Sequence, residues 1–221
     1  MDNTVIQLLL LAGIAVFLIL RLRSVLGTRE GYERPPEPLP RSDDRAGGRP
    51  ALDVIEGGVD HDIADHAPVG SSAAQALAAM KRVEPDFHVG DFLSGARQAY
   101  EMILMGFENG DMDNLVPFLS RDVFESFDEV VQLRDREGLR VEANFVGVRE
   151  VDLEDATYDE ATGTAEITVR FLGELTSVVL NREGEVVEGD RDKVKQQRDV
   201  WTFGRVMGSD NPNWKLVGTG E

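Results

Sequence analysis

The chain contains no cysteine among its 221 residues. Disulfide bonds, thiolate metal ligands and a cysteine nucleophile are therefore excluded. Histidine is also scarce, with three in total. His61 and His66 lie in the acidic stretch HDIADH, five residues apart, whereas ligands on one helical face are three or four apart. We therefore expect no metal site and no cofactor, and we interpret this stretch as a solvated polar loop.

Basic residues are few. The chain has 23 Lys+Arg against 41 Asp+Glu, a formal net charge of −18. Residues 87–221 alone hold 28 acidic and 14 basic residues. Binding to nucleic acid needs a Lys/Arg footprint, so this class of partner is excluded. The acidity favours solubility and would attract a basic partner, and an ordinary acidic surface without a specific partner is the alternative.

Catalytic patterns are absent as well. The sequence has no glycine-rich phosphate loop, no nucleophile elbow and no metal-ligand spacing. The acids that can be placed on predicted strands alternate outward, and His88 precedes the first helix of the globular region. No general base is therefore expected to face an apolar pocket. We assign no catalytic residue and predict that the protein is not an enzyme.

One long hydrophobic run is present, at Val5–Leu20, VIQLLLLAGIAVFLIL. Its 16 residues are short of the roughly 20 that span a bilayer, but the flanking Thr4, Arg21 and Arg23 can extend it. The chain starts without a basic residue, and no small-residue cleavage site follows, which disfavours a cleaved signal peptide. A buried helix of the globular domain is the other alternative. We predict a transmembrane anchor over residues 1–26.

The orientation of this anchor follows from its flanking charges. Arg21, Arg23, Arg29 and Arg34 all lie after the hydrophobic run, and no Lys or Arg lies before it. The positive-inside rule then predicts a single-pass protein of the inner (plasma) membrane. Its short N-terminus is expected outside and its C-terminal domain in the cytoplasm.

Residues 27–70 are rich in proline and glycine and poor in apolar side chains. Such a composition cannot bury enough surface to form a core, so we expect a disordered acidic tether, with a proline-motif ligand as the alternative. Residues 71–86 follow as a bridge. Ser71 precedes an alanine-rich run, which predicts a short helix that either packs on the domain or lies on the membrane surface.

Residues 87–221 have the composition of a globular domain. Helical periodicity is found over Asp91–Glu108, Asp111–Leu119 and the segment that Ser120 caps through Glu137. After Gly138 the period changes to two, and turn signals at 160–163, 181–184 and 209–212 separate strands. Helices followed by strands predict an α+β fold, with helices packed on a curved four-stranded antiparallel sheet. A strongly curved sheet of this kind usually leaves an apolar cavity.

At this point the residues resemble a known family. The pattern lies in Phe92…Gly95-Ala96, in Ala165–Phe171, and above all in the tryptophan-bearing segments Asp199–Arg205 and Asn211–Leu216. It is similar to the Tim44-like domain, the C-terminal domain of the mitochondrial import-motor adaptor of the inner-membrane translocase, and in particular to the bacterial TimA members. The resemblance covers about Pro85 to Thr219.

The resemblance implies a cystatin-like, nuclear-transport-factor-like cone with an apolar pocket. The mitochondrial relatives tether a heat-shock chaperone to the translocase and associate with cardiolipin-containing membranes, so a membrane-tethered adaptor is implied here. The long basic, coiled-coil-like N-terminal region of those relatives has no counterpart in this sequence. A complete import-motor role is therefore not carried over.

We accordingly predict a membrane-anchored, non-enzymatic adaptor for an unidentified protein partner, linked to protein translocation or chaperone recruitment. A carrier of lipid or of a small apolar ligand is the alternative, with lipid contact in the pocket, and an enzyme of the same fold comes third. For the aromatic residues among the binding candidates given below, the alternative to partner contact is that they pack in the core. For Arg205 and Arg170 it is a bridge between strands or an ion pair with Asp190 or Asp199, in place of contact with a carboxylate or lipid phosphate. The candidate pocket and partner-binding residues are Phe145, Val169, Phe171, Trp201, Phe203, Arg205 and Trp214.

Overall fold

The computed structural model describes residues 60–220. The predicted anchor at Val5–Leu20 and most of the predicted tether lie outside these residues. Within residues 60–220, no helix has both the length and the apolar character that a membrane crossing requires.

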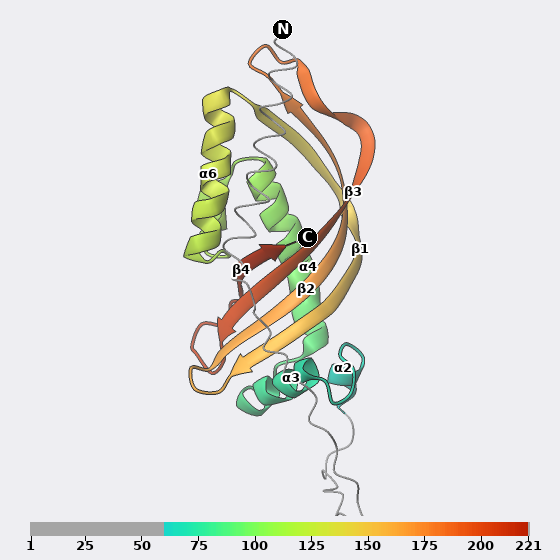
Figure 1. Cartoon of the computed structure of the whole chain (residues 1–221), viewed down its shortest axis with the longest axis vertical. Coiled ribbons are helices and arrows are strands. Elements are labelled where there is room, and N and C mark those ends of the chain that lie inside the picture. The colour runs from blue at the N-terminus through green and yellow to red at the C-terminus, as the bar shows by residue number, and fades with distance from the viewer. Residues whose placement is uncertain (1–59, 221) are drawn as a thin grey trace, which may run out of the picture. The chain divides into compact units, whose positions relative to one another are not determined.

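The described chain begins with helices and continues with strands (Figure 1). The five helices are α2 (His61–Ala64), α3 (Ser72–Val83), α4 (Val89–Glu108), α5 (Met112–Leu115) and α6 (Arg121–Glu137). The serines predicted as caps act as such, because Ser71 accepts a hydrogen bond from Ala74 N and Ser120 from Val123 N. Gly138 ends α6 in the left-handed conformation, at φ 70°.

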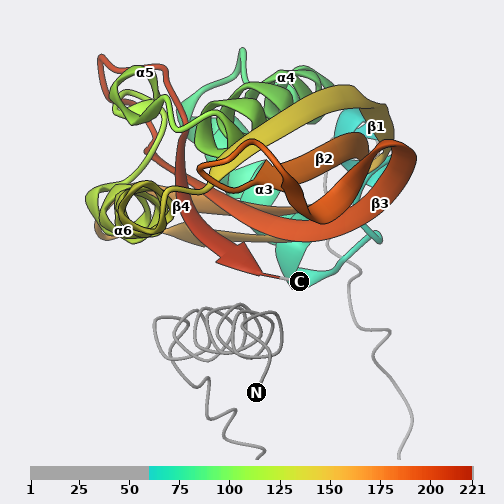
Figure 2. The ribbon, with the colours of Figure 1, turned by 90° about the horizontal axis from the view of Figure 1, so that it is seen from above.

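The strands form one open antiparallel sheet in the order β1-β2-β3-β4. They are β1 (Arg140–Asp159), β2 (Thr164–Leu180), β3 (Val186–Val206) and β4 (Lys215–Gly220). Each strand pairs with the next along the chain, which confirms the predicted α+β meander. Figures 1 and 2 show the sheet curving around α4.

The core lies between this sheet and the helices. Along β2, Ala165, Ile167, Val169 and Phe171 are fully buried, while the intervening side chains face outward. The helix α4 contributes Tyr100 and Ile103, which are also fully buried. The alternation predicted for this strand is therefore confirmed, and its apolar face is the one that the helices cover.

The end of the predicted tether belongs to the folded domain. The tether was expected to reach residue 70, but α2 forms at His61–Ala64, and Ile63 and Ala67 are buried in the core. The bridging helix α3 packs on the domain, because its Leu77 and Met80 are fully buried. Residues 60–70 contain few apolar side chains, so composition alone did not indicate that Ile63 and Ala67 pack in the core.

The second helix is shorter than predicted. It was expected over Asp111–Leu119, whereas α5 comprises Met112–Leu115 only. Pro117 has no backbone N–H to donate to the carbonyl four residues earlier, so the helical hydrogen-bond pattern stops at this position.

Candidate partner-binding site

Three of the predicted site residues, Phe145, Phe171 and Trp201, lie around the ring of Tyr100. Its centroid lies 4.5 Å from that of Phe171, in a stacked arrangement, and 4.7 Å from that of Trp201. Phe145 on β1 is 6.3 Å away and half-buried. Because Val169 and Phe171 have no exposed surface and Trp201 is 4% exposed, these three belong to the core.

The Tyr100 hydroxyl is the polar end of this aromatic cluster. It donates a hydrogen bond to Asp199 Oδ2 at 2.5 Å, and Gln197 Nε2 donates to the other oxygen, Asp199 Oδ1, at 3.2 Å. Burial, together with the hydrogen bond and the nearby charge of Asp199, raises the pKa of Tyr100. The tyrosine is therefore held as a neutral donor that fixes α4 to β3.

Gly173 on β2 provides the room for this hydroxyl. A Cβ atom at residue 173 would lie 2.6 Å from Tyr100 Oη, closer than such atoms approach. We expect Gly173→Ala to lower the free energy of unfolding by about 1–3 kcal/mol, because the ring must shift within a packed core. Chemical denaturation of the full chain measures this. The matched variant Gly147→Ala, where a Cβ meets nothing within 4 Å, should cost less, and equal losses would contradict the steric explanation.

A second aromatic group holds the other predicted residues. Phe92 of α4 packs edge-on against Phe203 at 6.0 Å and Trp214 at 4.9 Å between ring centroids. Phe87 lies 6.0 Å from Trp214. Phe203 is 2% exposed, whereas Trp214 is half-buried. This group therefore connects the core to the surface at the β3–β4 loop.

Arg205 covers the edge of this group, and its guanidinium carbon lies 5.7 Å from the Trp214 ring centroid. It forms an ion pair with Glu84, which follows α3, and donates to Pro212 O at 3.2 Å. The predicted pairing with Asp190 or Asp199 is therefore wrong. Glu84 lies far away in sequence but adjacent in space, and it also accepts a hydrogen bond from Gly208 N at 2.6 Å.

Arg170, by contrast, forms a surface pair. Its guanidinium lies 3.2 Å from Glu154 and 3.5 Å from Asp152, both on the neighbouring strand β1. All three side chains are about half exposed, so this arginine has no role in the aromatic groups.

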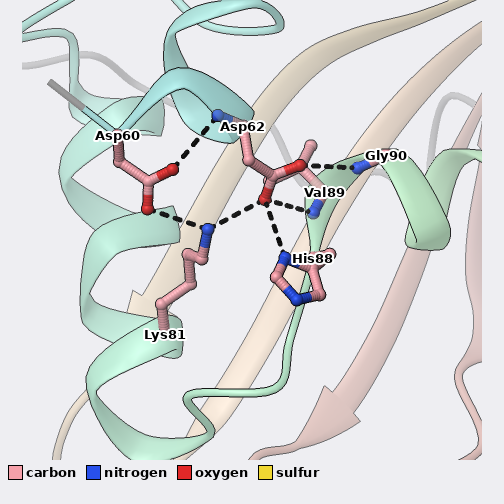
Figure 3. Close-up of polar contacts among 6 residues, drawn as sticks. All are labelled: Asp60, Asp62, Lys81, His88, Val89 and Gly90. Atoms are coloured by element: carbon pink, nitrogen blue, oxygen red, sulfur yellow. Dashed lines mark hydrogen bonds and ion pairs between the residues drawn. The ribbon is translucent and has the colours of Figure 1, made fainter.

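A polar cluster fixes α2 and α3 to the start of α4 (Figure 3). The Asp62 carboxylate accepts hydrogen bonds from Val89 N at 2.8 Å and Gly90 N at 3.1 Å, and thereby caps α4. Lys81 of α3 donates to Asp62 at 2.9 Å and pairs with Asp60 at 2.8 Å. Asp62 thus joins three helices.

Burial on its own would raise the pKa of Asp62, but the hydrogen bonds from Lys81, Val89 and Gly90 outweigh it and lower the pKa to about 2. The cluster was predicted as a solvated polar loop, and in the structure its central carboxylate is a structural cap instead. His88 Nδ1 lies 3.8 Å from this carboxylate.

The low pKa makes a prediction about acid stability. An unfolded aspartate titrates near pH ~4, so the stabilisation from Asp62 is complete above that pH and is lost as the pH falls through about 2. Asp62→Asn should lower the free energy of unfolding by about 2 kcal/mol at pH 7. The difference in stability between this variant and the wild type should become smaller below pH ~4. Denaturation curves across pH measure this. Asp65→Asn, an exposed neighbour, is the control, and a deficit independent of pH would exclude the ionic explanation.

The structure thus brings six of the predicted residues together in or beside two adjoining aromatic groups. The seventh, Val169, is buried in the core opposite Trp201 in the sheet. Sequence reasoning missed Glu84, Asp62 and the donor role of Tyr100. Their partners lie at least 19 residues away along the chain, so no local pattern indicated them. The one local hint was the position of the two acidic residues, since Glu84 directly follows α3 and Asp62 lies in the first turn of α2.

The chemistry of this region is that of packing and recognition. Among residues 60–220, no group of three or more His, Asp or Glu side chains is arranged to hold a metal ion. What the region presents at the surface is part of the half-buried ring of Trp214, which lies beside the largely buried guanidinium of Arg205. An aromatic ring and an arginine are side chains that protein interfaces use as anchors.

Comparisons with known proteins bear on this arrangement. The family model described as the Tim44-like domain matches residues 73–221. The mitochondrial import inner membrane translocase subunit TIM44 of Homo sapiens is 29% identical over 147 residues, or 65% of this chain and 32% of its own length. The corresponding Rattus norvegicus and Mus musculus proteins are 26% and 25% identical over the same shares.

Because the family model covers more than half of the sequence, the chain belongs to the Tim44-like domain family. The chain spans about a third of the length of the curated relatives that it matches. Among solved structures, the intermembrane space region of the chloroplast protein ARC6 aligns with 49% of this chain and 75% of its own, at 11% identity and a TM-score of 0.33. Nothing about function follows from a likeness at that level.

Proposed function

We propose that this protein is a membrane-anchored, non-enzymatic adaptor. Its Tim44-like domain binds a protein partner at the cytoplasmic face of the inner (plasma) membrane, in protein translocation or chaperone recruitment. The observation that carries the proposal is the family match over residues 73–221, together with relatives that are translocase subunits. The cystatin-like cone and its apolar pocket belong to the same proposal.

The physical basis of such an adaptor is effective concentration. The predicted anchor at Val5–Leu20 would hold the domain near the membrane, and the predicted tether that follows would set its reach. Binding of a partner at the same membrane then becomes nearly intramolecular, so a modest intrinsic affinity is sufficient.

The half-buried members of the aromatic groups are the best candidates for the contact. A fully buried side chain such as Phe171 cannot reach a partner unless the core opens, so its role is to support the fold. Trp214 and Arg205 lie together at the β3–β4 loop, where part of the ring is exposed. We therefore assign the partner contact to this loop.

A photo-crosslinking amino acid at Asn213, an exposed neighbour of Trp214, tests this assignment in cells that express the full chain. We expect one discrete crosslinked protein, identified by mass, and no such product from a crosslinker at the exposed Glu183 in the β2–β3 turn. Crosslinks to lipid alone would favour a carrier instead. A C-terminal tag found outside the membrane would overturn the proposed topology.

A further inference from the structure

The proline-rich segment Pro35–Pro40, PPEPLP, has no part in the function proposed above. It belongs to the predicted tether and lies outside the described residues. Each proline fixes φ at about −65°, so a run of prolines favours the extended polyproline II helix, which has three residues per turn. Pro35 and Pro38 then share one edge of that helix, and Pro36 and Leu39 share the next. The sequence therefore predicts a stiff ridge of apolar side chains.

The β3–β4 loop carries side chains that suit such a ridge. Polyproline II segments bind aromatic surfaces, because aromatic rings pack on the prolines and the segment is already extended before it binds. The half-buried ring of Trp214 lies 6.0 Å from Phe87 and 4.9 Å from Phe92 between centroids. Val83, 44% exposed, lies against the same loop, since a Cβ atom at Gly208 would be 3.3 Å from its Cγ1. Trp214, Val83 and the β3–β4 loop are here called the Trp214 surface.

The charges beside this surface are opposite to those beside the prolines. Asp86, next to Phe87 in the chain, and Asp210, in the β3–β4 loop, are both exposed. Neither forms an ion pair among residues 60–220. Arg34 and Arg41 stand immediately before and after the proline segment. Opposite charges at the ends of an apolar contact favour the encounter and fix its register.

The tether enters the folded domain close to this surface. Asp60, where the described residues begin, pairs with Lys81 of α3 at 2.8 Å (Figure 3). One helical turn later, Glu84 pairs with Arg205, whose guanidinium carbon is 5.7 Å from the Trp214 ring centroid. With a rise of about 1.5 Å per helical residue and the lengths of these side chains, Asp60 lies within about 30 Å of that ring.

We propose that the segment Pro35–Pro40 binds to the Trp214 surface of its own chain and competes there with the partner. The competition rests on the assignment of the partner contact to the β3–β4 loop. A chain as long as residues 42–59, with the composition of a tether, has an r.m.s. end-to-end distance of about 24 Å. This length matches the distance to be spanned, and at matched length the local concentration is highest, on the order of 1 mM.

The internal contact lowers the apparent affinity for the partner. With an intrinsic Kd of about 0.1 mM, that local concentration keeps the Trp214 surface occupied about ten times as often as free. The apparent Kd of the partner then rises about tenfold, because the partner binds only the free surface. The tether thus sets the availability of the adaptor as well as its reach.

Photo-crosslinking within the purified chain tests the internal contact in the absence of any partner. The full chain in detergent, with a photo-crosslinking amino acid at Asn213, is irradiated, and the monomer is isolated and digested with trypsin. We expect the peptide of residues 206–215 to be joined to that of residues 30–41, which contains the whole proline segment. The yield should not depend on protein concentration. A crosslinker at the exposed Glu183 in the β2–β3 turn should give no such product.

Variants of the proline segment address the polyproline ridge. Serine in place of all four prolines keeps the length of the tether and removes the ridge, so the internal crosslink should fall at least fivefold. In cells, the crosslink from Asn213 to the partner should then rise severalfold. Pro50→Ser, outside the segment, should change neither product. The four prolines are Pro35, Pro36, Pro38 and Pro40.

Charge reversals address the flanking arginines. Arg34→Glu with Arg41→Glu places acids beside Asp86 and Asp210, so the internal crosslink should fall as well. The matched control reverses two other arginines of the tether, Arg45 and Arg49, and should leave the yield unchanged.

The results distinguish this proposal from the proposed function. If Asn213 in the purified chain does not reach residues 30–41, or if the serine variant gives the same yield, the proposal is wrong whatever is captured in cells. A yield that grows with protein concentration would also overturn it, since the contact would then lie between chains. An internal crosslink without any captured protein in cells would leave the internal contact established and the partner assignment wrong.

Discussion

Replacing Phe171 by alanine is expected to lower the free energy of unfolding of the domain by about 3–5 kcal/mol. The side chain is fully buried and lies at the centre of the aromatic cluster, 4.5 Å from Tyr100 and 5.8 Å from Trp201 between ring centroids. Two contributions add up in this decrease of the free energy of unfolding. The burial of the phenyl ring away from water is lost, and a cavity remains because the surrounding side chains cannot move in to fill it.

Urea denaturation of the full chain in detergent measures this loss by tryptophan fluorescence, since Trp201 and Trp214, the chain's two tryptophans, lie in the domain. Arg170→Ala is the matched control, because the side chain is the sequence neighbour of Phe171 but is 51% exposed on the opposite face. We expect the control to cost less than about 1 kcal/mol. A similarly small loss for Phe171→Ala would show that the cluster is loosely packed and open to a ligand.

Replacing Glu84 by alanine is also expected to have a large effect, lowering the free energy of unfolding by about 3 kcal/mol. The Arg205 side chain is 10% exposed, so removal of its carboxylate partner leaves a nearly buried charge unpaired. Its Nε already has no hydrogen-bond partner within the described residues 60–220. Gly208 N would lose its acceptor as well. Burial by itself raises the pKa of Glu84, but the hydrogen bonds from Gly208 and Arg205 lower it overall, as expected for a charged pair.

A double-mutant cycle separates this pair from its surroundings. Glu84→Ala combined with Arg205→Ala should cost clearly less than the sum of the single losses, because neither charge is then left alone. The exposed pair of Arg82 with Glu160, 3.7 Å apart, is the control on the same helix, and Glu160→Ala should change stability by less than about 0.5 kcal/mol. Additive losses at Glu84 and Arg205 would contradict a direct interaction.

Much of the fold could be predicted because its signals are local. The serines at 71 and 120 cap the helices that follow them, and Gly138 ends α6, as their chemistry predicts. The alternation over Ala165–Phe171 identified the buried face of β2 correctly. Each of these features depends on a few consecutive residues, so a short segment of sequence is sufficient to predict it.

The candidate site was predicted less well. The aromatic residues of β2 and β3 lie together in the structure, but their pattern in the sequence did not distinguish a pocket lining from a core. Phe171 and Trp201 pack against the ring of Tyr100, which precedes them by 71 and 101 residues in the chain. The predicted partner of Arg205 was wrong for the same reason. Glu84 lies 121 residues away in the sequence, and no local pattern indicates a pair at that separation.

The sequence by itself determined the order and type of the elements, the family, and the acidity of the domain, because capping, periodicity and charge are properties of short segments. Only the tertiary structure decided that Asp62 caps a helix and that Glu84 pairs with Arg205. Those outcomes depend on which distant segments meet when the sheet curves around α4, and no local interaction specifies that geometry.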